Sequence, residues 1–400
     1  MKFLHTSDWH LGQVFFDRTR TEEHQRFLNW LIDTLRDHQV SLFLHAGDIF
    51  DHPNPSHESL RLFFTFLHRM ATETPVERSI WIAGNHDSAA LLQAFAPILT
   101  ALNATLVSTP EDENIFVESD DLLIAAVPFL RERDIVQSSA GLTVEERERR
   151  IIEAIEQFYQ HIATLADRRK SPGQKVIAMG HLFVRAAKTA GSERIVHIGN
   201  LGSVPSTIFP DTFDYAALGH IHRYQRIAGA TEIVYSGAPI PLSFDEVAIP
   251  HGVILGNWQN SNTVEIDFLP VPQFRLLKVL RGTVDQLLEA VETLPDNLEL
   301  SPWISCLVEA PAVGIDVIET LRNAAADRNA EILQIQPVID RPDKHIDRFP
   351  HLDLIAALQP ETMFEKLCEE RGIDAKQQKI LRKYFHQALQ RAQEQSAAAE

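Results

Sequence analysis

The sequence predicts an α/β protein with a small α+β module and a helical tail behind its main domain. As far as residue 270, short apolar runs alternate with amphipathic helical stretches, which is typical of α/β sheets. From residue 276 the order becomes strand, helix, strand, helix, strand, as in small α+β modules. A polar linker and two helices follow Arg341-Pro342. We therefore expect a main domain at 1–270, an accessory module at 271–342, and a linker with a helical tail at 343–400.

The individual elements follow from hydrophobic periodicity. In the main domain, apolar residues at helical spacing predict helices at 21–38, 56–71, 88–102 and 143–169. Short apolar runs predict strands at 2–6, 41–45, 79–83, 122–127, 175–179, 215–218, 232–235, 252–255 and 264–269. In the module we expect strands at 276–280, 303–309 and 331–338, and helices at 284–294 and 315–326. The tail helices are predicted at 360–371 and 374–393, and the second carries an apolar stripe through Leu381, Tyr384, Phe385 and Ala388.

Composition narrows the class of protein. With 44% hydrophobic and 23% charged residues, the chain has enough apolar material for an ordinary globular core. Its two cysteines, Cys306 and Cys368, are too few for a disulfide framework, which favours a reducing compartment. Since no signal peptide and no apolar run of membrane-spanning length is present, we expect a cytoplasmic protein without a membrane partner.

The net charge of −18 argues against a freestanding protein that wraps a polyanion. Divalent cations bound at one site would reverse the sign of the charge there without changing this balance.

Five predicted strands end in residues that can bind metals. In four of these strands the first such residue follows a glycine, which permits a tight turn and a close approach of the backbone. These four residues are Asp48, Asn85, His181 and His220. In α/β sheets such loops converge beyond the carboxyl ends of the strands. A single histidine or a single Gly-Asn-His-Asp turn is explained as well by a satisfied polar residue or a helix cap, whereas five strands ending alike are not. The seven candidate ligands are Asp8, His10, Asp48, Asn85, His181, His220 and His222.

The ligand types indicate the metal chemistry. Carboxylates, an amide oxygen and imidazoles, without a thiolate, suit Mn, Fe or Zn better than a soft metal. Seven donors are too many for one tetrahedral ion, but they suit a pair of ions bridged by one carboxylate. The residues alone therefore predict phosphoester hydrolysis at a two-metal site.

The ordered motifs resemble those of the calcineurin-like metallophosphoesterase superfamily, and within it those of bacterial DNA nuclease subunits. The resemblance covers about 270 residues strongly and the later module mainly in layout. The narrower match rests on four stretches: His5-Thr6-Ser7-Asp8-Trp9-His10-Leu11-Gly12, Pro128-Phe129-Leu130-Arg131, Gly219-His220-Ile221-His222-Arg223, and Ser236-Gly237-Ala238-Pro239-Ile240-Pro241-Leu242-Ser243-Phe244.

The resemblance implies a four-layer α/β/β/α sandwich and a division of labour among the site residues. Asp8, His10, Asp48 and His222 would hold a first ion, and Asp48, Asn85, His181 and His220 a second, with Asp48 bridging. His86 would contact the scissile phosphate and stabilise or protonate the leaving oxygen, with Asp87 orienting it. The family's preferred metal is Mn²⁺. Where other relatives have a histidine after Gly-Asp-x-x, this chain has Asp51 and then His52, whose roles stay open.

The resemblance also implies substrate and partners. The substrate would be DNA, cut as a double-strand exonuclease and as a hairpin or single-strand endonuclease during end processing, replication and recombination. The module at 271–342 would cap the site and help to bind DNA. The tail at 343–400 would bind a coiled-coil ATPase of the ABC type, although its apolar stripe could instead cover its own domain. A homodimer within a heterotetramer is expected.

Two other functions remain in view. A small-molecule or protein phosphatase of the same superfamily would need no module or partner helix after residue 270. A catalytically silent scaffold would lack ligands, and this chain has the complete set.

Overall fold

The structure is a computed structural model. Up to residue 338 it describes all positions outside 112–114, 137–141, 191–192, 194–202, 259–263, 296–297 and 311, and beyond that point it describes 364, 368, 377–378, 381–382 and 384–385. Contacts divide the chain into two compact units, Met1–Ile339 and Asp340–Glu400. In the second unit the described residues are helical, and the rings of Phe364 and Phe385 stack with centroids 4.7 Å apart. Most of the two predicted tail helices lies outside the described residues.

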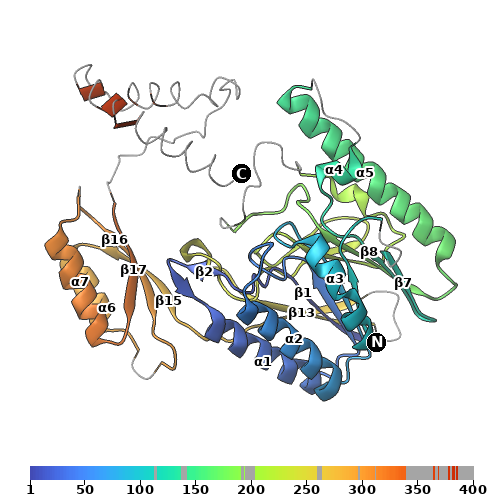
Figure 1. The fold of residues 1–400 in the computed structure, drawn as a ribbon, viewed down its shortest axis with the longest axis horizontal. Coiled ribbons are helices and arrows are strands. Elements are labelled where there is room, and N and C mark those ends of the chain that lie inside the picture. Colours follow the sequence, from blue (N-terminus) through green and yellow to red (C-terminus); the bar gives the residue numbers. More distant parts are fainter. Residues whose placement is uncertain are drawn as a thin grey trace. The chain divides into compact units, whose positions relative to one another are not determined.

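Two six-stranded sheets form the centre of the first unit (Figure 1). The first sheet has the order β14-β13-β1-β4-β5-β6, and its strands are β1 Lys2–Thr6, β4 Leu42–Ala46, β5 Arg78–Ile82, β6 Ala104–Val107, β13 Gly252–Asn257 and β14 Glu265–Pro270. The second has the order β11-β12-β10-β9-β8-β7, and its strands are β7 Phe116–Glu118, β8 Leu122–Ala126, β9 Lys175–His181, β10 Tyr215–Gly219, β11 Gln225–Ile227 and β12 Glu232–Tyr235. Four neighbouring strands of each sheet run parallel, β1-β4-β5-β6 in the first and β12-β10-β9-β8 in the second.

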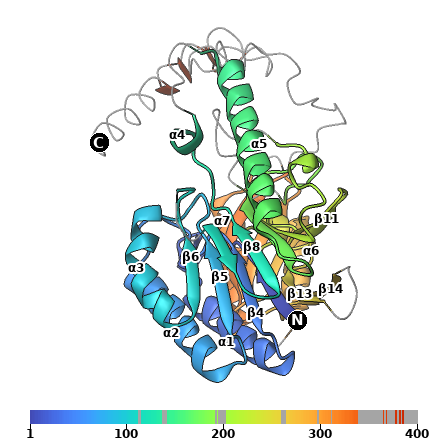
Figure 2. The same ribbon diagram turned by 90° about the vertical axis from the view of Figure 1, so that its right-hand side faces the viewer.

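Helices cover the outer faces of both sheets (Figure 2). On the first sheet lie α1 Thr21–Asp37, α2 His57–Glu73 and α3 Ala89–Ala101, and on the second lies α5 Val144–Arg169, preceded by the short α4 Glu132–Ile135. Side-chain caps start three of them: Ser56 accepts a hydrogen bond from the Ser59 amide, Ser88 from that of Leu91, and Thr143 from that of Glu146.

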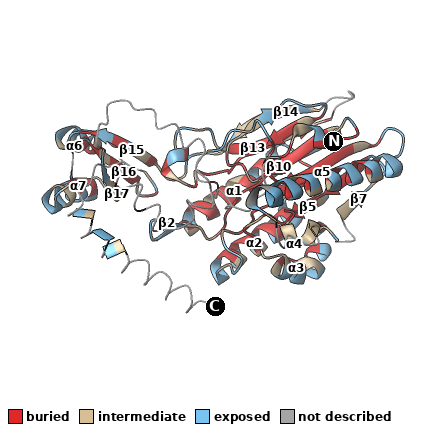
Figure 3. Ribbon diagram, turned by 90° about the horizontal axis from the view of Figure 1, so that it is seen from above, coloured by how far each residue is buried: buried red, intermediate tan, exposed pale blue. Residues whose placement is uncertain are grey.

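Three apolar layers hold this arrangement together. One lies between α1, α2, α3 and the first sheet, one between α5 and the second sheet, and one between the two sheets. The central strands, such as β4 and β8, are therefore buried on both faces, whereas the helices are exposed on one (Figure 3). The predicted four-layer α/β/β/α sandwich is confirmed. Among the described residues no helix combines the length and apolarity needed to cross a membrane.

The accessory module follows the predicted order of elements. They are β15 Leu277–Gly282, α6 Val284–Glu292, β16 Trp303–Val308, α7 Ile315–Asp327 and β17 Glu331–Pro337. The three strands pair in parallel, and both helices pack on one face of the sheet through a core of their own. The module belongs to the same compact unit as the sandwich, so the boundary at residue 270 stays a prediction.

A small hairpin, β2 Val14–Phe15 and β3 Arg18–Thr19, lies on the side of the sandwich next to the module (Figure 1). Its two-residue strands are too short to give a periodic signal, and sequence analysis missed it. Phe15 stacks on Trp303 with ring centroids 5.6 Å apart, and together with Phe244 and Leu277 these residues form an apolar cluster between sandwich and module.

Beside this cluster lies a buried group of charges. Glu23 accepts two hydrogen bonds from the guanidinium of Arg20, and its Oε2 lies 3.6 Å from Nε of Arg275. Arg275 in turn lies over the Trp303 ring, 4.0 Å from its centroid. Arg20 also donates to Oε1 of Gln13, 2.9 Å away. The charge group therefore connects the start of the module to the loop after β1.

Candidate metal centre

Loops from both sheets converge at the carboxyl ends of their parallel strands, as expected for an α/β protein. Asp8 and His10 follow β1, Asp48 follows β4, Asn85 follows β5, His181 ends β9, and His220 and His222 follow β10. The structure brings all seven predicted residues together in two adjoining clusters. Except for Asn85 and His220, which are half-buried, their side chains are almost fully buried.

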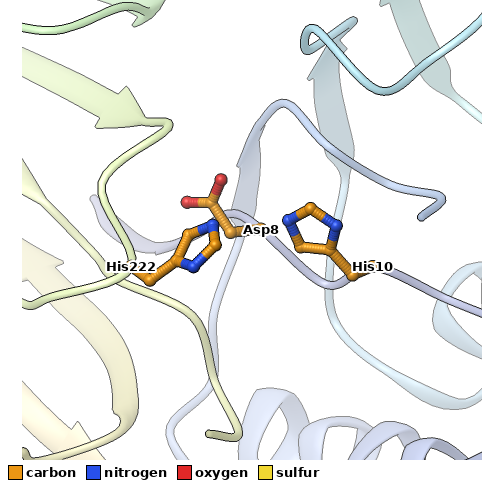
Figure 4. Close-up of side chains that lie close together, drawn as sticks. All are labelled: Asp8, His10 and His222. Carbon is orange, nitrogen blue, oxygen red and sulfur yellow. The ribbon is translucent and has the colours of Figure 1, made fainter. Parts of the chain in front are cut away.

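The first cluster consists of Asp8, His10 and His222. Their donor atoms lie within 4.8 Å of one another, and the Asp8 carboxylate lies beside the His222 ring, with the His10 ring on the other side of Asp8 (Figure 4). Nδ1 of His10 donates to Oδ1 of Asp51 at 3.1 Å, and Nδ1 of His222 donates to Oε1 of Glu246 at 3.1 Å. In each ring Nδ1 thus bonds a carboxylate, and such carboxylate partners commonly orient histidines that bind a metal through the other ring nitrogen.

The second cluster consists of Asp48, Asn85, His181 and His220. Oδ1 of Asn85 lies 3.0 Å from Nε2 of His181 and 3.0 Å from Nδ1 of His220. Nε2 of His181 lies 3.3 Å from Oδ2 of Asp48, while its Nδ1 donates to the carbonyl oxygen of Ala46 at 2.8 Å. All four side chains therefore direct donor atoms toward one point.

Asp48 joins the clusters. Its Oδ2 lies 3.7 Å from Nε2 of His10, and its donor atoms lie within 4.8 Å of those of Asp8 and His181. This is the position that a bridging carboxylate requires.

The loops reach this geometry through unusual backbone conformations. Asp8, His10, Asp48 and His220 all have positive φ, at 54°, 47°, 54° and 90°. Such strain is concentrated at functional sites in proteins. Gly84 has to be glycine for a different reason, because a Cβ there would lie 2.1 Å from Oδ1 of Asp48.

The electrostatics favour cations. Burial alone would lower the pKa of His181, but the Asp48 carboxylate outweighs it and raises the pKa to about 9. Burial is likewise outweighed at His222, where the hydrogen bond to Glu246 and the charge of Asp8 raise the pKa to about 9. At Asp48 burial would raise the pKa, yet the charge of His181 holds it well below its usual value. The Asp48 carboxylate is thus ionised and stabilises positive charge beside it.

The donor set fits divalent metal ions. Nε2 of His10 is buried and has no hydrogen-bond partner among the described residues, although it points toward Asp48. A buried nitrogen of this kind is costly unless another group binds it. Carboxylate, imidazole and amide donors without a thiolate suit ions of intermediate hardness.

His86 and Asp87 lie at the edge of the centre but differ in their contacts. The His86 amide donates to Oδ1 of Asp48 at 2.8 Å, and its Nδ1 donates to the backbone oxygen of Asp51 at 2.8 Å. The Asp87 carboxylate accepts from the amides of Ile49, Phe50 and Gly84, because the turn at residue 84 directs it beneath the loop after β4. The hydrogen bond at Nδ1 of His86 thus ends on Asp51, and the expected orienting role of Asp87 stays a prediction.

A profile of the calcineurin-like phosphoesterase family matches residues 1–224 of the chain. A relative from Escherichia coli K12, the SbcD protein of the nuclease SbcCD, is 32% identical over 395 residues, which cover 97% of this chain and 98% of that one. The chain belongs to the SbcD branch of the calcineurin-like phosphoesterases. Proteins with the same name from Rhodobacter capsulatus and Bacillus subtilis are 33% and 26% identical, and the matches cover 74% and 99% of this chain and 77% and 100% of those proteins. A second profile, described as type 5 capsule protein repressor C-terminal domain, matches residues 273–371.

Some residues of this SbcD-family site could not be assigned from the sequence. The sequence assigns no role to Asp51, yet Asp51 holds His10 through its side chain and His86 through its carbonyl oxygen. The sequence does not mark Glu246 as part of the site, because it lies in a 3-10 helix, Phe244–Glu246, that extends beyond the motif ending at Phe244. Ser7 donates to Oδ2 of Asp8 at 2.5 Å and also bonds Ser236 at 2.7 Å; both serines lie in the family motifs, which offered a clue to their importance.

Proposed function

We propose that this SbcD-family chain is the nuclease subunit of a DNA-processing complex and hydrolyses phosphodiester bonds in DNA with two divalent metal ions. The observation that carries the proposal is the pair of donor clusters joined at Asp48. Double-strand exonuclease and hairpin or single-strand endonuclease action are proposed from the motifs that the chain shares with nuclease subunits.

The two clusters supply the metal ligands in this proposal. Asp8, His10, Asp48 and His222 hold one ion, and Asp48, Asn85, His181 and His220 hold the other. Bound there, two divalent cations supply Lewis-acid polarisation of the phosphate and a lowered pKa for water. Mn²⁺ is the proposed ion, because its intermediate hardness suits mixed oxygen and imidazole donors.

His86 is the proposed proton donor. The carbonyl oxygen of Asp51 can only accept a hydrogen bond, so Nδ1 of His86 carries a proton and Nε2 is the nitrogen that we assign to the substrate. In its protonated form Nε2–H donates to the leaving oxygen as the phosphorus–oxygen bond breaks. Asp87 acts as a positioning residue, because its carboxylate fixes the β5 turn and the loop after β4 together.

The proposed partner is an SbcC-type coiled-coil ABC ATPase, bound by the tail at 343–400 and supplying part of the DNA-binding surface. Such a partner reconciles the net charge of −18 with a nucleic-acid substrate. We further propose a homodimer within a heterotetramer. The α3 helix supports it, because Ile98 is 54% exposed on this strongly apolar helix while Leu92 and Leu99 face its own core. The complex would act in the cytoplasm.

A nuclease assay tests the central claim. The purified chain is incubated with hairpin DNA and with blunt duplex DNA in Mn²⁺ or Mg²⁺, with and without the ATPase. We expect Mn²⁺-dependent cleavage of both substrates, which the ATPase stimulates. If the chain hydrolyses small phosphomonoesters but does not cleave DNA, it is a phosphatase instead. If it binds two metal ions and hydrolyses neither kind of substrate, the claim that it is an enzyme is contradicted.

A further inference from the structure

A groove opens between the hairpin β2–β3 of the sandwich and the module's sheet. It has a volume of about 490 Å³, which lies in the range of roughly 300–1,000 Å³ typical of ligand pockets. The helices α6 and α7 cover the other face of the sheet, so Val279, Leu307 and Gln336 border the groove on the open face. Phe16 and Leu242 border it from the sandwich.

The groove has a rigid floor. Phe15, Phe244 and Trp303 pack beneath it, with Phe15 parallel to the Trp303 ring at an interplanar angle of 8°. An exposed ion pair between Arg18 of the hairpin and Glu331 of β17 spans its two walls. The groove is therefore preformed and needs little ordering when a ligand binds.

Phe16 is unusual within this frame. It occupies the hairpin turn with φ of 47°, followed by Asp17 with φ of 61°, positions that normally favour Gly or Asn. The residue is nevertheless 44% exposed, and its ring centroid lies 5.5 Å from that of Phe244. A bulky aromatic residue in a strained turn that buries it only partly is a cost to the fold. Such strain points to a contact outside the fold.

The remaining wall chemistry indicates what kind of contact this is. Among the described residues that line the groove, Asp245 is the single ionisable one. None of these residues is a cation that could bind a phosphate group. Gln334 accepts a hydrogen bond from Ser305 at 3.0 Å, which leaves its amide hydrogens directed to other acceptors. Gln336 is exposed beside it. An aromatic face next to carboxamides matches the flat surface and polar edge of a nucleobase.

The groove also begins next to the metal centre. Gln13 lines it, and the amide of Gln13 donates to the carbonyl oxygen of His10 at 3.0 Å. The Gln13 side chain is held by Arg20 and by the carbonyl oxygen of Leu242. A strand whose phosphate lies at the metal centre can thus place its neighbouring nucleotides along this wall.

We propose that the groove binds unpaired nucleobases of the DNA substrate, with Phe16 stacking on a base and Gln334 and Gln336 contacting its polar edge. This inference rests on the proposed nuclease function and specifies how the site recognises hairpin loops and single strands. Duplex DNA would not use the groove in the same way, because its bases are already stacked and paired.

The test uses the full-length chain with Mn²⁺ and two hairpins that differ only in their loops, one with bases and one with abasic sites. One stacked base contributes a factor of roughly ten in affinity. Wild type should cut the loop with bases about tenfold more efficiently than the abasic loop. Phe16→Ala should lose this preference, and Phe16→Tyr should keep it. Ile315→Ala, which alters a 75% exposed residue of α7 outside the groove, should behave as wild type.

A second readout is independent of cleavage. In Ca²⁺ instead of Mn²⁺, 2-aminopurine in the loop reports stacking as quenched fluorescence, which should recover in Phe16→Ala. The inference would be overturned if wild type and Phe16→Ala showed the same preference for the loop with bases. It would also be overturned if Phe16→Ala impaired only the binding of the partner ATPase, because the groove would then be a protein-docking site. Inactivity of wild type on every DNA substrate would instead contradict the proposed function.

Discussion

At the scale of single residues, His86 is the side chain of the centre that we propose acts on the substrate. A donor atom of its ring lies within 4.8 Å of donor atoms of His10 and Asp48, so this role has to be tested against that of a metal ligand. Its amide and Nδ1 are both committed to the loop after β4, so the ring is held at the edge of the donor clusters. The ring lies edge-on to that of His10, with centroids 4.7 Å apart. This position suits a group that contacts a phosphate already bound by metals.

His86→Ala should therefore keep both metals and lose turnover. Loss of one general acid typically slows a reaction by about 10²–10⁴-fold, and we expect a decrease in kcat of that order on DNA with little change in KM. Elemental analysis of the dialysed variant should still find two metal ions per chain. A variant with one ion would show that His86 is a ligand.

Metal binding should depend strongly on pH. The pKa values of His181 and His222 are raised to about 9 by their carboxylate partners against the effect of burial. Below that pH each imidazole carries a proton that a cation must displace, so affinity for Mn²⁺ should rise with pH. Because His222 and His181 belong to different clusters, each ion displaces one of these protons, and the affinity of each site should rise by up to about tenfold per pH unit. Calorimetry in two buffers of different ionisation enthalpy counts the protons, and an affinity that is constant from pH 6.5 to 8.5 would contradict the expectation.

At the scale of elements, one buried and two exposed charge pairs among the described residues join the module to the sandwich. The buried Glu23 compensates Arg20, which is 1% exposed, and approaches Arg275. The pair Arg18 and Glu331 joins the same two parts but leaves about half of the arginine side chain exposed. Buried and exposed pairs of this kind contribute very differently to stability.

Glu23→Gln should destabilise the chain by about 3–5 kcal/mol, because it leaves the guanidinium of Arg20 buried without a carboxylate. Glu331→Gln, the matched control at the exposed pair, should cost about 1 kcal/mol or less. Urea denaturation followed by tryptophan fluorescence measures both, since Trp303 lies under Arg275. Equal losses would show that the buried pair has no special role.

Whether an element could be predicted depends on whether its sequence carries a hydrophobic period or a local motif. The long buried strands and the glycines before Asp48 and Asn85 carry periodic or local signals, so the sandwich and the candidate ligands could be placed. The hairpin β2–β3 could not, because two-residue strands have no period. The partners of the ligand histidines could not either. Glu246 contacts His222 from a distant segment, and the hydrogen bond from His86 ends on a carbonyl oxygen, which no side chain reveals.

At the scale of the whole molecule, we propose that two regions of the chain bind other chains. One is the apolar side of α3. Ile98→Glu would place a charge in the proposed dimer interface, so it should convert a dimer to a monomer at micromolar concentration. Light scattering after gel filtration measures this. Ile315→Glu, at another exposed isoleucine, should remain dimeric. If Ile98→Glu and Ile315→Glu have the same molar mass in solution, the dimer interface lies elsewhere.

The other region is the tail. The unit Met1–Ile339 contains every residue of the metal centre. Removal of the residues after 345 should therefore abolish binding of the ATPase in a pull-down experiment but preserve Mn²⁺-dependent hydrolysis of bis(p-nitrophenyl) phosphate. A truncated chain that folds and yet hydrolyses nothing would refute this division.

The two donor clusters draw on both sheets, and this has a consequence for folding. The first sheet contributes Asp8, His10, Asp48 and Asn85, and the second contributes His181, His220 and His222. An ion held by residues of both would act as a further cross-link between two layers that pack mainly through apolar side chains and are also joined by the hydrogen bond of His5 Nδ1 with the Tyr215 hydroxyl, 2.9 Å long. Each tenfold excess of free metal over its dissociation constant adds about 1.4 kcal/mol to the free energy of unfolding. The ions needed for hydrolysis would thus also stabilise the packing of the two sheets against each other. Removal of the metal would lower the stability of the protein as well as its activity.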